Sequence, residues 1–83
     1  MARYLSEIAK EILKDMQTGN KAASLRYPYA WPYLMAMMEL NSIDDSYYAD
    51  SAKSVILYFL ANAASWKGET ARRIKAELKE LVK

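Results

Sequence analysis

The stretch from Ser54 to Trp66, SVILYFLANAASW, constrains this chain most, because it carries no formal charge between Lys53 and Lys67. At about 100° per residue, a helix through this stretch has one broad apolar face. That face contains Val55, Ile56, Phe59, Leu60, Ala63 and Ala64, with Leu57 and Trp66 on its two sides. The remaining strip, which suits contact with water, runs through Asp50, Ser54, Tyr58 and Ser65. A helix this apolar needs neighbours on several sides. We therefore expect an all-α fold in which other helices enclose residues 54–66.

The length and composition set the scale of the fold. The chain has 83 residues, which we expect to form a single small helical domain spanning residues 1–83. Its hydrophobic fraction of 53% is above the usual roughly 45–50%. Two explanations of this high hydrophobic fraction stay open. Either the core is rich in Ala, Met and aromatic side chains, or part of the apolar surface is buried against another chain. The formal net charge of +2 is too small to indicate nucleic-acid binding by itself.

Missing residue types exclude several kinds of chemistry. The chain has no cysteine and no histidine, which excludes disulfides and thiolate metal sites and removes the commonest general base. We therefore expect a protein that is not an enzyme and has no cofactor. No uncharged run approaches the roughly 20 residues of a membrane helix. The first residues carry charges at helical spacing instead of a signal-peptide core. We expect a cytoplasmic protein without membrane contact.

An amphipathic helix is predicted from Arg3 to about Gln17. Its apolar side chains recur at helical spacing, and charged residues occupy the opposite side. The apolar face contains Leu5, Ile8, Ala9, Ile12, Leu13 and Met16. Gly19 is suited to a left-handed conformation at the end of this helix.

Aromatic residues alternate with other residues from Tyr27 to Tyr33, in the sequence YPYAWPY. Because each proline disfavours the helical conformation of the residue before it, Tyr27 and Trp31 should be extended. Pro32 suits the first turn of a helix. We expect an extended Tyr/Pro/Trp arm between the first and second helices. Its rings either wrap the bundle and fill grooves between helices or remain available for binding, including stacking on single-stranded bases.

The second predicted helix runs from about Pro32 to Leu40 and is apolar except for Glu39. A helix without a polar face is either central in a bundle or part of an interface. Methionine and tryptophan side chains make adaptable, large contacts at interfaces. The candidate contact residues for self-association are Trp31, Leu34, Met35 and Met38. The alternative is that this methionine-rich run belongs to the core.

The third predicted helix runs from about Asp45 to Ser65, with Asp44 as its cap. Ile43 and Tyr48 have the spacing of a hydrophobic staple around that cap. The carboxylates of Asp44, Asp45 and Asp50 are the candidates for binding a hard cation. No loop supplies enough oxygen ligands around them, so we expect no metal site.

The fourth predicted helix follows Lys67–Gly68, opens at Glu69 or Thr70, and runs from Ala71 to about Leu81. Its apolar seam contains Ala71, Ile74, Leu78 and Leu81. Beside the seam lie four cations within roughly 80° of one another on the helix, Arg72, Lys75, Lys79 and Lys83, which we call the basic ridge. The ridge either contacts phosphates or an acidic partner, or is an ordinary C-terminal helix surface whose lysine stems cover the seam.

A pattern of capping, core and helix-end residues runs through the second half of the chain. It reads SIDDxYYxDS over residues 42–51, FLxN over 59–62, WxG over 66–68, and Ala71 followed by IKxELK over 74–79. This pattern resembles small uncharacterised helical proteins encoded by tailed phages, including marine phages. The resemblance implies a source, and it implies no activity because the matching residues occupy structural positions.

Together these features predict a four-helix, bundle-like all-α domain whose third helix is central. The function that we expect is a small protein-interaction module that associates with itself as a homo-oligomer. Binding of nucleic acid or of an acidic partner through the basic ridge is the alternative.

Overall fold

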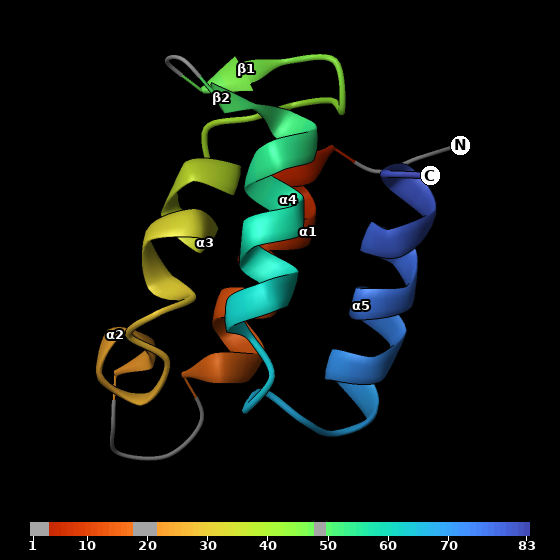
Figure 1. Cartoon of the computed structure of the whole chain (residues 1–83). Helices are drawn as coiled ribbons and strands as arrows, with labels where there is room; N and C mark the ends of the chain where they lie inside the picture. Colours follow the sequence, from red (N-terminus) through yellow and green to blue (C-terminus); the bar gives the residue numbers. More distant parts are fainter. Residues whose placement is uncertain (1–3, 18–21, 48–49) are drawn as a thin grey trace.

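The structure, a computed structural model, describes residues 4–17, 22–47 and 50–83 and is built mainly from helices (Figure 1). Over these residues it contains the helices α1 (Leu5–Met16), α2 (Ala23–Arg26), α3 (Trp31–Met37), α4 (Ala52–Asn62) and α5 (Glu69–Leu81), and the strands β1 (Ser46–Tyr47) and β2 (Asp50–Ser51). The all-α expectation is confirmed. Figure 1 shows α4 between α3 and α5, with α1 behind it.

One hydrophobic core joins the longer helices. The apolar spacing predicted for the first and last helices is confirmed, because both turn that face inward. The buried side chains are Leu5, Ile8, Ala9, Ile12 and Met16 on α1 and Ala71, Ile74 and Leu78 on α5. From α4, Phe59 is fully buried, and its ring meets the edge of Trp66 at 6.1 Å between centroids.

The start of α1 is fixed by the chain that follows α3. The N–H groups of Leu5 and Ser6 donate to the carbonyl oxygens of Asn41 and Leu40 at 2.9 and 2.8 Å. The first N–H groups of a helix have no partner within the helix, so these carbonyls satisfy them. The predicted positions Arg3 and Gly19 lie outside the described residues.

The predicted extended arm is wrong. Residues 28–30 form a turn, and α3 begins at Trp31, whose N–H donates to the carbonyl of Tyr27 at 3.0 Å. A following proline disfavours the helical conformation without forbidding it. Here the hydrogen bond and the packing of Trp31 against the core offset that cost. The placement of Pro32 in the first helical turn is confirmed.

A hairpin replaces the first part of the predicted third helix. The strands β1 and β2 pair antiparallel, with Ser46 opposite Ser51. The carboxylate of Asp45 accepts from the N–H groups of Asn41 and Ser42 at 2.8 and 3.2 Å, so it points back along the chain and caps no helix. Side chains of this kind compete with helix formation by bonding to nearby backbone.

The helix α4 therefore starts at Ala52, and the predicted cap at Asp44 is wrong. Ser51 is the cap instead, because its hydroxyl oxygen accepts from the N–H of Ser54 at 3.1 Å. Of the predicted staple pair, Tyr48 lies outside the described residues, and no helix begins beside Ile43. At the other end α4 stops at Asn62, earlier than predicted, and Trp66 lies in the connection to α5.

Candidate functional site

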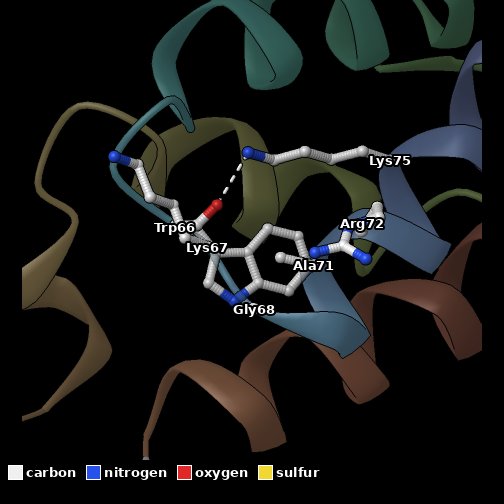
Figure 2. A pocket seen from close by; sticks show the side chains of 6 residues that line it. All are labelled: Trp66, Lys67, Gly68, Ala71, Arg72 and Lys75. Carbon is white, nitrogen blue, oxygen red and sulfur yellow. Dashed lines mark hydrogen bonds between the residues drawn. The ribbon is translucent and has the colours of Figure 1, made fainter.

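A depression of about 330 Å³ lies where the connection after α4 enters α5 (Figure 2). It is open to solvent on one side. Its lining comes from one short segment of chain and consists of Trp66, Lys67, Gly68, Ala71, Arg72 and Lys75. This lining includes three cationic side chains and no carboxylate. We call it the basic depression.

Trp66 makes the basic depression rigid on its inner side. The side chain is only 1% exposed. Its indole Nε1 donates to the Asp15 carboxylate on α1 at 2.7 Å, and its ring packs against Phe59 of α4. One side chain thus ties the connection to two other helices, which holds the floor of the depression in place.

Lys75 is committed to the backbone beneath the depression. Its ammonium donates to the carbonyl oxygens of Ala63 at 2.8 Å and of Trp66 at 2.7 Å, the latter drawn in Figure 2. Both carbonyls lie just beyond the end of α4, where backbone acceptors lack helical partners. Burial of the ammonium, with Lys79 and Lys67 nearby, lowers the pKa of Lys75 from its usual 10.5. Lys75 therefore ties α5 to the connection that follows α4.

The structure divides the predicted basic ridge. Lys75 bonds to backbone, and Lys83 forms an ion pair with Glu80 at 2.7 Å. Arg72 and Lys79 are exposed and form no ion pair with another described residue. Within the described part of the chain, two of the four predicted cations thus have no ion-pair partner, and the ridge is not the continuous surface that helical spacing suggested.

Lys67 is a basic residue of the site that the sequence reasoning missed. The sequence placed it at the end of the preceding helix, whereas the structure puts it on the rim of the basic depression, on the opposite side of the Trp66 indole from Arg72 in Figure 2. Gly68, the cap of α5, has φ +119°, a conformation that side-chain-bearing residues rarely adopt. A glycine between Lys67 and a following amphipathic helix was the available signal, because such a residue turns the chain sharply.

A second depression, of about 300 Å³, lies beside the first helix and is lined by Glu11, Lys14, Asp15 and Thr70. Its lining mixes acidic and basic side chains. Glu11 also forms an ion pair with Arg73, which ties α5 to α1. The carboxylates make this depression unsuited to an anion.

The predicted contact residues of α3 do not form one exposed surface. Leu34 is 0% exposed and belongs to the core. Trp31, Met35 and Met38 are partly buried against that core. The helix contacts both α4 and α1. The alternative, that this methionine-rich run belongs to the core, is therefore right for Leu34. Trp31, Met35 and Met38 are only partly buried, so they lie at the edge of the core.

Apolar side chains are exposed on α4 instead, on a surface that we call the outer face of α4. Leu57 is 47% and Tyr58 51% exposed, and Ala61, one turn further along α4, is exposed as well. The Tyr58 ring lies 5.5 Å from the Tyr33 ring of α3, so the face continues onto that helix. The expectation that helices enclose residues 54–66 on most sides is thus met on the inner side only. α3 and α5 pack on α4 and leave the outer face open.

The candidate cation ligands do not come together. Asp45 bonds to the backbone of Asn41 and Ser42, and Asp50 lies in β2. Across residues 4–17, 22–47 and 50–83, no group of three acidic, histidine or cysteine side chains is placed to hold a metal ion.

Comparison with protein-family models, curated proteins and solved structures found no match in any of the three. The resemblance to phage proteins therefore stays a prediction. None of the helices in the described part of the chain has the length and apolar character needed to cross a membrane. The described part of the chain offers two candidate surfaces, the basic depression and the outer face of α4.

Proposed function

We propose that this protein is a small non-enzymatic interaction module that associates with itself through the outer face of α4. The observation that carries the proposal is the half-exposed pair Leu57 and Tyr58 on a helix with a single charged residue, Lys53. A cytoplasmic location is part of the same proposal. Binding of nucleic acid or an acidic partner through the basic ridge stays a prediction.

A second copy of the chain suits this face electrostatically. In a two-fold symmetric dimer the same surface is used by both partners, so any charge on it meets a like charge. The exposed residues Leu57, Tyr58 and Ala61 carry no charge, and the one charged residue of α4, the exposed Lys53, lies one turn before Leu57 at the edge of the face. Burying the exposed half of Leu57 stabilises the contact by about 1 kcal/mol in each partner.

The size of the face indicates a weak dimer. The 11 residues of α4 form a strip about 16 Å long and about 10 Å wide. A standard interface buries about 800 Å² on each partner, far more than such a strip supplies. We therefore expect a dissociation constant on the order of 100 µM, equivalent to about −5.5 kcal/mol.

Sedimentation velocity at concentrations from about 10 µM to about 1 mM tests this proposal, because the range spans the expected dissociation constant. The mass should rise above the 9.5 kDa of one chain as concentration increases. Leu57→Glu should abolish the rise, because it puts like charges in the contact. Leu25→Glu is the matched control: Leu25 is 72% exposed on α2, so its replacement should leave association unchanged.

Met35→Glu decides between α4 and the α3 residues predicted from the sequence. Association lost with Met35→Glu but kept with Leu57→Glu would move the contact to α3 and contradict the α4 surface. A species of 9.5 kDa at every concentration would contradict self-association altogether. Circular dichroism of each variant checks that it keeps the helical fold.

A further inference from the structure

We propose that the basic depression binds a phosphate group, carried by a small molecule or by a nucleic-acid backbone, and that Lys67 and Arg72 hold it. This inference concerns a different surface from the outer face of α4 and does not depend on self-association. The site belongs to the segment 66–75, which is described throughout (Figure 2).

Lys67 and Arg72 are cations without a carboxylate partner among the residues that the structure describes. Both are exposed, and neither forms an ion pair with another described residue. Their neighbour Arg73 differs, because it pairs with Glu11. No carboxylate lines the basic depression, and the nearby Asp15 carboxylate accepts from the Trp66 indole. Within the described residues, no ion pair therefore engages the two cations at the rim, although the exposed Glu69 in the first turn of α5 offsets part of their charge.

Lys75, which also lines the depression, adds to this positive field. The Lys75 ammonium is held there by two carbonyl oxygens, and it lies 5.7 Å from the centre of the Trp66 ring. The helix α5 begins at Glu69, and its cap residue Gly68 has no side chain to bond to the first N–H groups. Those groups contribute partial positive charge on the same side. An entering anion thus meets charge that is already in position.

The volume and chemistry of the depression favour a phosphate group. About 330 Å³ lies near the lower limit of roughly 300–1,000 Å³ for small-molecule sites. The guanidinium of Arg72 can donate two parallel hydrogen bonds to phosphate oxygens, and Lys67 adds a point charge. Because the depression is open, the phosphate keeps part of its contact with water, and we expect weak binding.

Nuclear magnetic resonance titration of ¹⁵N-labelled protein with pyrophosphate at low salt tests the site. The protein carries Leu57→Glu, so that self-association plays no part. Saturable shifts should appear at the amides of residues 67–72 and at the Trp66 indole. Lys67→Gln and Arg72→Gln should each weaken binding about tenfold, the effect of losing one charge-assisted contact. Lys53→Gln is the matched control: it removes the same charge from an exposed position on α4 and should leave pyrophosphate binding unchanged.

A single-stranded oligonucleotide in the same assay distinguishes the two sources of phosphate. Tighter binding than pyrophosphate, with shifts extending to Lys79 and a loss on Lys79→Gln, would support the site and identify a nucleic-acid backbone. Equal binding of both probes, unaffected by Lys79→Gln, would support the site and identify a small phosphate compound. Shifts that do not saturate, or that Lys53→Gln reduces as much as Arg72→Gln, would overturn the proposal.

Discussion

Lys75 shows how the role of one residue depends on its surroundings. On a helical wheel it is one cation of the basic ridge, yet its ammonium lies between the carbonyl oxygens of Ala63 and Trp66. The partners precede it in the chain by 12 and 9 residues. The contact exists because the chain reverses between α4 and α5, and α5 then runs back along α4 (Figure 1). Lys75 therefore joins the end of one helix to the middle of the next.

At this scale we predict that Lys75→Met lowers the free energy of unfolding by about 1–3 kcal/mol. Methionine keeps the apolar stem but leaves two carbonyl oxygens without a charged donor. Urea denaturation measures the change. Lys79→Met, on the exposed side of the same helix, should alter stability by less than about 0.5 kcal/mol. An equal loss in both variants would show that the Lys75 ammonium has no special role.

The start of α4 is a competition between two capping sequences. Asp44 and Ser51 both have side chains suited to a helix cap. Asp45 bonds back to Asn41 and Ser42, and its own carbonyl accepts from the N–H of Ala52 at 2.9 Å. The bond from Ala52 closes the base of the β1–β2 hairpin, and the chain becomes helical only after Ser51.

At the scale of the element we predict that Ser51→Ala destabilises the protein by about 1 kcal/mol. The substitution removes the acceptor for the N–H of Ser54. Thermal or urea unfolding followed by circular dichroism measures this loss. Asp44→Ala is the matched comparison, since it removes the cap predicted from sequence, and it should have a smaller effect. A larger loss from Asp44→Ala would indicate that the helix starts where the sequence predicted.

At the scale of the molecule, the protein is organised around the inner side of α4. Phe59 is fully buried and contacts Trp66, which in turn bonds to Asp15 of α1. Ion pairing between Arg73 and Glu11 joins α5 to α1 at the surface. The helices α1, α4 and α5 are therefore linked through a small set of side chains, and disruption at Phe59 should reach all of them.

We predict that Phe59→Asp unfolds the protein. Losing a buried phenylalanine costs about 3–5 kcal/mol, and an unpaired buried carboxylate costs several more. This sum is comparable with the roughly 5–15 kcal/mol that stabilises a typical domain. Leu57→Asp, two residues earlier on the exposed outer face, should remain folded by circular dichroism and amide chemical-shift dispersion. A cooperatively folded Phe59→Asp variant would contradict the central position of this side chain.

The sequence by itself determined the elements whose spacing is strong and local. The apolar faces of α1 and α5 follow from periodicity, and the place of Pro32 in the first turn of α3 follows from the backbone limits of proline. The absence of charge from Ser54 to Trp66 likewise identified a segment with a buried side. Such features depend on neighbours within one or two helical turns, and those neighbours are the same in any fold.

Only the tertiary structure decided which side of α4 is covered and which cations are free. Periodicity could not show that α3 and α5 leave Leu57 and Tyr58 exposed, because that depends on how many helices reach α4. It also could not separate Lys75 from Arg72, since the acceptors of Lys75 lie on a preceding segment. Both outcomes are set by long-range packing, where burial and hydrogen bonding between distant segments outweigh local preference.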